Sequence, residues 1–204
     1  MTLPHSSASP STPILYRGHK VGLGPQTREM IPLYYQWLND QEFCMWGGDS
    51  FLPHTLASVE EHAEHAMRDK SPHSVNFGIY DLETMAPIGF CMLRHIFLED
   101  SVAEFGIGIG DKRFWGRGYG TEATILTLDY GFSVLGVHNI MLSTAGYNVR
   151  AIRAYEKAGF RVIGRRREAR KVGRQRYDLV LMDCLASEFE SPLPPVVPQP
   201  PRQA

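Results

Sequence analysis

Residues 115–123 read WGRGYGTEA, a glycine-rich segment that runs directly into a long apolar-faced stretch. Alternate glycines let the backbone turn sharply and expose its N–H groups with no Cβ in the way. The first turn of a following helix adds unpaired N–H donors and the positive end of the helix dipole. The segment therefore predicts an anion-binding loop at the start of a helix.

The residues of this loop restrict the ligands that it suits. A nucleoside triphosphatase needs Gly-Lys followed by Ser or Thr, but Gly120 is followed by Thr121 and Glu122. A dinucleotide fingerprint needs a glycine where Thr121 stands and an acidic residue about 20 positions later, and residues 135–140 carry none. A Walker loop is excluded and a Rossmann loop is disfavoured, which leaves coenzyme A as the common ligand of such a turn.

The longer segment IGIGDKRFWGRGYGTEA, residues 107–123, resembles the central motif Q/R-x-x-G-x-G/A of the GNAT superfamily of N-acetyltransferases. Trp115 replaces the usual Gln or Arg, a variant similar to the branch that holds the ribosomal-protein and spermidine acetyltransferases. The resemblance covers about Tyr16 to Phe189. It implies an α/β (α+β) fold with a mixed, mostly antiparallel sheet of about seven strands, splayed at the fourth and fifth, and about four helices.

Residue patterns outside the loop predict elements in the same order. Strands are expected at 20–23, 74–80, 87–96, 102–109, 140–145, 160–167 and 175–185. Helices are expected at 27–37, 121–135 and 148–158, the last closed by Gly159. The S-x-x-E pattern of Ser58 to Glu61 is a capping box that predicts a further helix reaching about Arg68.

Length and composition favour one domain, because 204 residues with 43% apolar content suffice for one sizeable core. We expect a single acyltransferase domain at 16–189, between a disordered segment at 1–15 and a proline-rich disordered tail at 190–204. A formal net charge of −1 argues against binding to nucleic acid by bulk charge.

Several classes of site and location are disfavoured by the sequence. No run of 18 apolar residues and no signal sequence is present, so we expect no contact with a membrane and a cytoplasmic protein. Three widely spaced cysteines are typical of reduced thiols that pack in a core. His62 and His65 have the i, i+3 spacing of metal ligands but no third ligand accompanies them, so no metal is expected.

The strand expected at 102–109 places Glu104, Gly106 and Gly108 on one face, with Gly110 continuing the alternation. Close approach of a ligand is one explanation for such a bare face, and relief of crowding in a bulged or edge strand is the other. The resemblance implies that the pantetheine arm of the cofactor lies along this strand. A strand N–H between Ile107 and Ile109 is also a candidate oxyanion donor.

Residues 148–160, NVRAIRAYEKAGF, place Asn148, Ala151 and Tyr155 on one helix face. Taken alone, these residues suit a helix N-cap and a half-buried core tyrosine. They also resemble the GNAT pattern N-x-x-A-x-x-x-Y-x-x-x-G-F. That resemblance implies that the Asn contacts pantetheine and that the Tyr hydroxyl protonates the departing thiolate.

An alkylamine acceptor needs a base, because its pKa of about 10.4 keeps it protonated at neutral pH. Glu104 is the expected base, acting through water, and His95 is the second candidate; for Glu104, pairing with an arginine is the structural alternative. Acidic and aromatic residues of the N-terminal helices suit a cationic amine. The expected acceptor residues are Trp37, Asp40, Glu42, Trp46 and His95, with Asp49 beside them.

The predicted site combines Tyr155 and Glu104 as catalytic residues with a larger set of cofactor contacts. These contacts are Ile107, Gly108, Ile109, Trp115, Gly116, Arg117, Gly118, Tyr119, Gly120, Thr121, Asn148, Ala151, Arg153 and Tyr155. The resulting hypothesis is an acetyl-CoA-dependent N-acetyltransferase, monomer or homodimer. It moves an acetyl group to a primary amine of a small molecule or a protein N-terminus by direct attack in a ternary complex.

Two other functions remain open. One is a non-catalytic acyl-CoA-binding sensor or interaction module. The other is a ribosome- or RNA-associated protein that uses the arginine-rich segment at 165–176. The acceptor amine and the use of acyl groups larger than acetyl also stay open.

Overall fold

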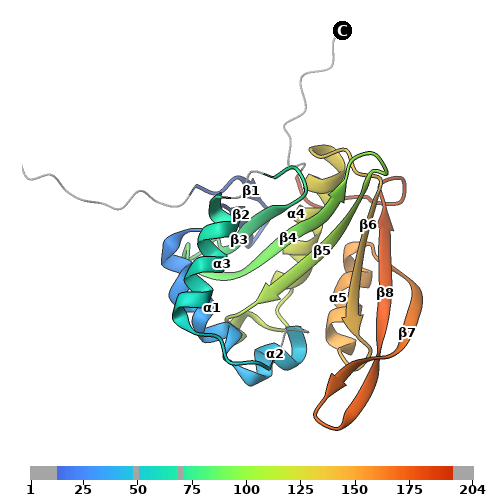
Figure 1. The fold of residues 1–204 in the computed structure, drawn as a ribbon. Helices are drawn as coiled ribbons and strands as arrows, with labels where there is room; N and C mark the ends of the chain where they lie inside the picture. Colours follow the sequence, from blue (N-terminus) through green and yellow to red (C-terminus); the bar gives the residue numbers. More distant parts are fainter. Residues whose placement is uncertain (1–12, 48–50, 69–70, 195–204) are drawn as a thin grey trace, which may run out of the picture.

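The computed structural model describes residues 13–47, 51–68 and 71–194, which contain one eight-stranded sheet with helices on both faces (Figure 1). Its strands are β1 (Tyr16–Arg17), β2 (Val21–Gly24), β3 (Val75–Asp81), β4 (Pro87–Phe97), β5 (Val102–Ile109), β6 (Asn139–Ala145), β7 (Arg161–Val172) and β8 (Gln175–Leu185). The α-helices are α1 (Ile31–Leu38), α2 (Gln41–Gly47), α3 (Leu56–Arg68), α4 (Tyr119–Ser133) and α5 (Val149–Ala158). Short 3₁₀ turns at Arg28–Met30 and Lys112–Phe114 precede α1 and α4.

The predicted fold class is confirmed, with two elements added to the predicted set. β1 has only two residues and α2 only seven, so both are shorter than the stretch over which a hydrophobic periodicity is recognised. Helix α3 also begins earlier than expected, because the Oγ1 atom of Thr55 accepts a hydrogen bond from the N–H of Ser58 at 3.1 Å. Thr55 is therefore the cap, and the predicted capping box at Ser58 is wrong.

The described structure extends beyond the expected folded range at both ends. Residues 13–15 and 190–194 are part of it, and Leu193 is buried in the main core. The other residues of the two expected tails, 1–12 and 195–204, lie outside the described residues. Within the described part of the chain, no helix has the length and apolar composition needed to cross a membrane.

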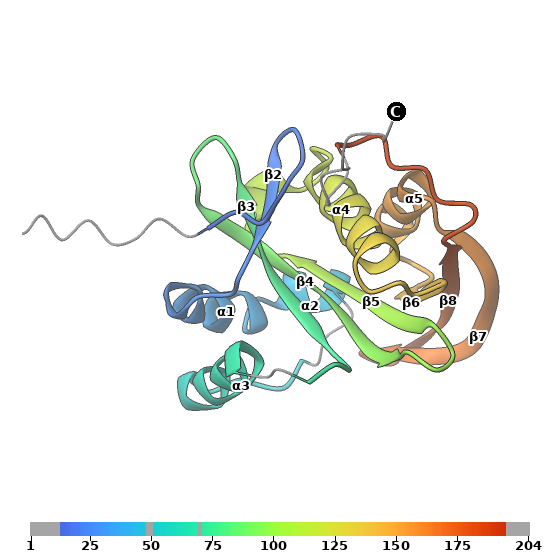
Figure 2. The same ribbon diagram turned by 90° about the horizontal axis from the view of Figure 1, so that it is seen from above.

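The helices divide the core between the two faces of the sheet, as the view from above shows (Figure 2). Helices α4 and α5 cover one face, where Leu126, Ile140 and Met182 belong to the larger cluster of buried side chains. Helices α1, α2 and α3 lie on the other face, where Met30 and Tyr34 belong to a second cluster. All three cysteines are free and buried, as expected of packing residues.

The sheet splays between β5 and β6, the one parallel pair among the described strands. Their pairing consists of Val102 with Asn139, Ala103 with Ile140 and Glu104 with Met141. Beyond Glu104, β5 pairs with β4 alone, and β6 pairs with β8 alone, among the strands of the structure. We call this region, residues 105–109 of β5 and 142–145 of β6, the splay.

The glycine-lined face of β5 is covered by aromatic side chains. A Cβ at Gly110 would lie 1.9 Å from Cδ2 of Trp37, and a Cβ at Gly108 would lie 2.9 Å from Cζ of Phe43. These rings come from α1 and α2, so the glycines let the helices pack closely on the strand. Relief of crowding therefore explains Gly108 and Gly110, whereas an added Cβ at Gly106 would meet the Met92 side chain at 3.3 Å.

Replacing Gly110 by Ala is expected to lower the free energy of unfolding by about 1–3 kcal/mol, since the buried Trp37 ring has to move. The matched control is Gly164→Ala in β7, where an added Cβ meets nothing within 4 Å. Urea unfolding followed by tryptophan fluorescence measures both variants. Equal midpoints for Gly110→Ala and the control would show that Trp37 does not pack as described.

Candidate active site

The glycine loop forms the predicted start of a helix. Gly116 and Gly118 have φ angles of 71° and 87°, which favour glycine, and Gly118 is the N-cap of α4. The N–H of Glu122 donates to the carbonyl of Gly118 at 3.0 Å, and no side chain of the described residues caps the helix. The preceding N–H groups of Tyr119, Gly120 and Thr121 therefore have no helical acceptor and are available to an anion.

Side chains of the loop anchor it to the sheet. The hydroxyl of Tyr119 donates to Oδ1 of Asp81 at 3.2 Å, and Nε1 of Trp115 donates to the carbonyl of Ile109 at 2.7 Å. The buried Glu122 carboxylate accepts from the N–H groups of Lys20 and Val21 at 2.8 and 3.0 Å. These bonds join the loop to β2, β3 and β5, so the N–H donors are held in place.

Lys20 is a candidate site residue that the sequence analysis missed. Its Nζ donates to the carbonyl of Arg117 at 3.0 Å and lies 5.5 Å from the centroid of the Tyr119 ring. The guanidinium of Arg117 lies 5.9 Å from the same ring. Two cations therefore lie beside the start of α4. Local sequence patterns could not reveal the contact, because 97 residues separate Lys20 from Arg117.

The backbone of β5 offers hydrogen-bonding groups to the splay. The N–H of Gly110 donates to the carbonyl of Ile88 on the β4 side at 2.9 Å. Because these groups alternate along an antiparallel strand, those of Gly108 also face β4, whereas those of Ile107 and Ile109 face the splay. The geometry thus agrees with Ile107 and Ile109 as backbone contacts but not with Gly108.

Tyr155 lies on α5 beside the first residue of the splay. Its ring centroid is 6.3 Å from that of Phe105 and 6.0 Å from that of Phe160. Burial raises the pKa of the Tyr155 hydroxyl to about 12, so the group is protonated at neutral pH. No described residue forms a hydrogen bond with this hydroxyl, which leaves its proton available to a ligand.

Glu104 ends the β5–β6 pairing and forms two ionic hydrogen bonds. Nη2 of Arg94 donates to Oε1 at 2.6 Å, and Nδ1 of His95 lies 2.9 Å from Oε2. Burial acts to raise the pKa of Glu104, but the bonds and charges of Arg94 and His95 outweigh it and lower the pKa. The predicted alternative of an arginine pair is confirmed, and a carboxylate held in this way is a weaker base.

His95 stands at an irregularity in β4. Its φ is 49°, an unusual value for a residue other than glycine, and the register with β5 shifts between Arg94 and Phe97. With Nδ1 bonded to Glu104, the second ring nitrogen is left for another partner. The side chain is 66% exposed, so an acceptor can reach it.

Asn148 has the structural role that its position at the start of a helix predicts. Its Oδ1 accepts from the N–H of Ala151 at 3.1 Å, which confirms the N-cap. Its Nδ2 donates to the carbonyl of Trp46 at 2.7 Å and so joins α5 to α2. Both ends of the amide are therefore engaged, and its contact with a cofactor stays a prediction.

The expected acceptor residues are mostly engaged with other parts of the protein. Trp37 is buried against Gly110 and is not at a binding surface, which corrects that expectation. Asp40 and Glu42 both accept from Nζ of Lys112 at 2.8 Å, so the two carboxylates share one cation. Asp49 lies outside the described residues.

Trp46 and Trp115 meet on either side of Arg150, the second residue of α5. The guanidinium carbon lies 4.5 Å from the Trp115 ring centroid and 5.6 Å from that of Trp46. This cation–π contact connects α5, α2 and the glycine loop. Arg153, the predicted phosphate contact, is exposed on the same helix.

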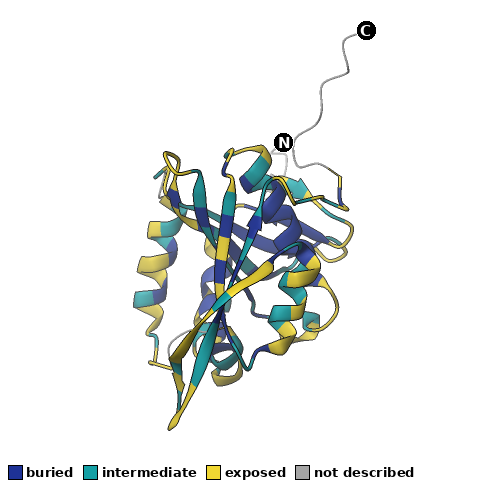
Figure 3. Ribbon diagram, turned by 90° about the vertical axis from the view of Figure 1, so that its right-hand side faces the viewer, coloured by how far each residue is buried: buried dark blue, intermediate teal, exposed yellow. Residues whose placement is uncertain are grey.

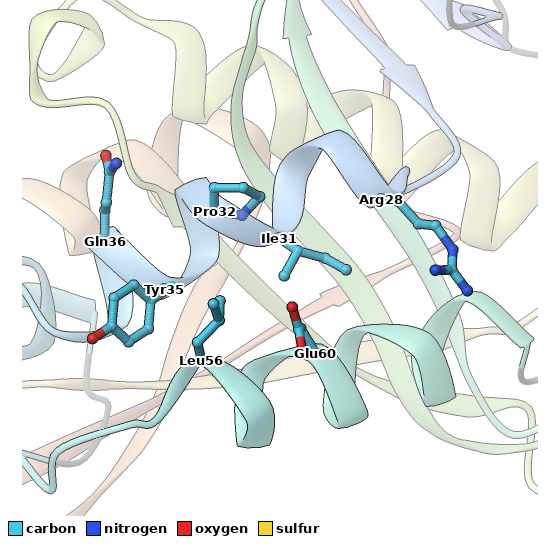
Figure 4. Close-up of a pocket in the computed structure, with 7 residues that line it drawn as sticks. All are labelled: Arg28, Ile31, Pro32, Tyr35, Gln36, Leu56 and Glu60. Carbon is cyan, nitrogen blue, oxygen red and sulfur yellow. The ribbon is translucent and has the colours of Figure 1, made fainter.

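A separate pocket of about 370 Å³ lies between α1 and α3 (Figure 4). It is lined by Arg28, Ile31, Pro32, Tyr35, Gln36, Leu56 and Glu60. None of these residues belongs to the loop, the splay or the Glu104 cluster. The pocket is therefore distinct from the candidate active site. In the described part of the chain no group of His, Cys, Asp and Glu side chains could hold a metal ion.

Comparison with known proteins gives similar chains in several organisms. The chain is 29% identical over 113 residues to the uncharacterized N-acetyltransferase p20 of Bacillus licheniformis, covering 55% of this chain and 63% of p20. It is 26% identical over 162 residues to the alpha/beta-tubulin-N-acetyltransferase 9 of Mus musculus, covering 72% and 64% respectively. The matches thus span less than two thirds of either relative.

The fold has counterparts among solved structures. The spermidine N-acetyltransferase from Vibrio cholerae, in complex with CoA and spermine, superposes with a TM-score of 0.75 at 24% identity. The superposition covers 83% of this chain and 97% of that protein. Residues 20–161 match the family model of the acetyltransferase (GNAT) domain. Because this match spans more than half of the chain, the chain belongs to the GNAT acetyltransferase family.

Proposed function

We propose that the protein transfers an acetyl group from acetyl-CoA to a primary amine by direct attack in a ternary complex. This proposal rests on a series of groups that suit successive parts of acetyl-CoA and that follow one another from the start of α4 along β5 to Tyr155. The free N–H groups at the start of α4 suit the diphosphate, and the backbone edge of Ile107 and Ile109 suits the pantetheine amides. Tyr155 lies at the far end of that edge, beside Phe105.

Acetyl-CoA supplies an activated acyl thioester when it is bound. The protein has to donate a proton to the leaving sulfur, and the Tyr155 hydroxyl is protonated and without a partner among the described residues. Phe105 and Phe160 hold the ring in place. These observations therefore support Tyr155 best as the general acid, because its ring is held in position and its hydroxyl has no competing acceptor.

The base proposed for this reaction is the His95–Glu104 pair. Glu104 lies next to Phe105 in β5, and side chains of successive strand residues point to opposite faces of the sheet. The base and Tyr155 are thus on opposite faces at the beginning of the splay. Since the pKa of Glu104 is lowered, we infer that the free ring nitrogen of His95 accepts the amine proton and that Glu104 orients the imidazole.

Release of the coenzyme A thiol from acetyl-CoA tests the proposal. The protein is expected to release thiol in the presence of at least one amine from a panel of polyamines, amino acids, aminoglycosides and peptides with free N-termini. Mass spectrometry of the amine product separates transfer from simple hydrolysis. Saturable acetyl-CoA binding without thiol release for any amine would contradict the enzyme and favour the sensor.

A further inference from the structure

The segment 165–178 carries a strong local charge, and we call it the basic hairpin. It contains seven of the chain's 21 basic residues and only two acidic ones, whereas the whole chain has a net charge of −1. The residues are exposed along most of β7, which is the edge strand of the sheet (Figure 3). Such a concentration raises the local positive potential well above that of the protein as a whole.

The basic hairpin is fixed next to the open end of the splay. The Tyr177 ring of β8 lies 4.7 Å from that of Tyr147, and the Tyr147 hydroxyl donates to the carbonyl of Met45 in α2 at 2.7 Å. The N–H of Gly146 donates to the carbonyl of Asp178 at 2.8 Å. The hairpin therefore packs on the turn that follows β6, at the end of β6 that has separated from β5.

The orientation of the cations follows from the register of β7 with β8. Arg166 pairs with Leu179 and Arg170 pairs with Tyr177, and residues that pair directly across two strands share a face. Because Tyr177 faces Tyr147 and α2, Arg166 and Arg170 lie on the face that α2 borders. Helices α4 and α5 cover the opposite face of the sheet.

The charges of this region are not balanced by nearby acids. The cations that form no ion pair with any described residue are Arg165, Arg166, Arg167, Lys171, Arg174 and Arg176. The acids that α2 and its start bring to the same border, Asp40 and Glu42, already bind Lys112. A polycation arriving at this border would meet like charges, whereas an anion would meet unpaired ones.

From this arrangement we propose that the acceptor is the N-terminal amine of a peptide whose following residues carry carboxylate or phosphate groups, selected by the basic hairpin. The inference rests on the proposed acetyl transfer and names its substrate class. The cations attract and orient the anionic part of the acceptor, and the amine is left for His95 and the acyl donor. In such a peptide the amine reaches His95 at the beginning of the splay while the anionic side chains reach the hairpin at its open end, a span that a free acidic amino acid lacks.

The test compares kcat/KM for a peptide that begins Ser-Glu-Glu-Glu, the isosteric peptide Ser-Gln-Gln-Gln, L-glutamate and spermidine. The acidic peptide is expected to be the best acceptor, and L-glutamate, whose carboxylates lie beside its amine, is expected to be a poor one. In the variant with Arg166, Arg170 and Arg174 changed to Gln, kcat/KM for the acidic peptide is expected to fall about tenfold, with the value for Ser-Gln-Gln-Gln unchanged. The preference for the acidic acceptor should also weaken as the salt concentration rises from about 50 to about 300 mM, because salt screens exposed charges.

The control removes the same number of cations elsewhere, with Arg17, Arg68 and Lys157 changed to Gln, and it should retain the preference. Spermidine as the best acceptor, or an equal loss for both peptides in the hairpin variant, overturns the inference. A rise in KM for acetyl-CoA with no change in acceptor preference also overturns it, because the cations would then serve the cofactor. Absence of thiol release with every amine is a different result and contradicts the acetyl transfer itself.

Discussion

Replacing Tyr155 by Phe is expected to lower kcat by about 10²- to 10⁴-fold, the range typical of a lost general acid. The change removes only the hydroxyl, which forms no hydrogen bond with the described residues, so packing against Phe105 and Phe160 is retained. The dissociation constant for acetyl-CoA and the melting temperature should therefore stay close to those of the unaltered protein. Steady-state kinetics, calorimetric titration with acetyl-CoA and thermal unfolding measure the three quantities.

Tyr130 provides the matched control for this substitution. It is a partly buried tyrosine of α4 whose ring packs 5.1 Å from that of Phe77 and 5.3 Å from that of Tyr16, with burial likewise raising its pKa. Tyr130→Phe should leave kcat unchanged. If Tyr155→Phe also leaves kcat unchanged, Tyr155 has no part in proton transfer and is a core residue only.

Substitution of either member of the His95–Glu104 pair is expected to lower kcat/KM by about 10²-fold, and the double variant should be no slower than the worse single one. His95→Gln removes the proton acceptor, and Glu104→Gln removes the carboxylate that orients it. Two groups that act as a unit give such non-additive losses, whereas independent roles would multiply. Additive losses, or full activity of His95→Gln, would contradict the pair.

The pH dependence of kcat/KM distinguishes a catalytic His95–Glu104 pair from a merely structural ion pair. Arg94 helps to lower the pKa of Glu104, so Arg94→Ala should raise that pKa and strengthen the interaction of the carboxylate with the proton on His95. A base that holds its proton more tightly loses it at higher pH. The acidic limb of kcat/KM should thus move to higher pH in Arg94→Ala and stay in place in Arg94→Lys.

The same ion pairs predict how stability responds to acid. The pKa of Glu104 is lower in the folded protein than in an unfolded chain, so its contribution to stability is present above the unfolded value of about 4.3. That contribution is lost as pH falls through the folded pKa.

Elements with a strong local pattern were predicted well from the sequence. The bounds of β5 and β8 agree with the predicted ranges, and Gly159 closes α5 in a left-handed conformation with a φ of 112°. In each case the signal is the alternation of neighbours or the backbone freedom of a glycine. Helix α2 was not predicted because its seven residues are fewer than the roughly 11–18 over which a helical periodicity is recognised.

The candidate site, like the fold, has features that local sequence predicts and contacts that it does not. The glycine loop and the register of Asn148 with Tyr155 depend on residues within one loop or one helix, so the sequence by itself was enough to predict a donor site and a candidate acid. The sequence also left the pairing of Glu104 with an arginine as an alternative, and only the packing of β4 on β5 identified Arg94 and His95 as its partners.

Contacts between distant segments were decided by the tertiary structure alone. It brought Lys20 to the helix start and Lys112 to Asp40 and Glu42, and it packed Trp37 against Gly110. These contacts join residues far apart in the chain, where no local spacing can report them. The sequence shows which residues can form an ion pair or leave room for a close contact. Which residue is the partner is decided only when the sheet and the helices pack together.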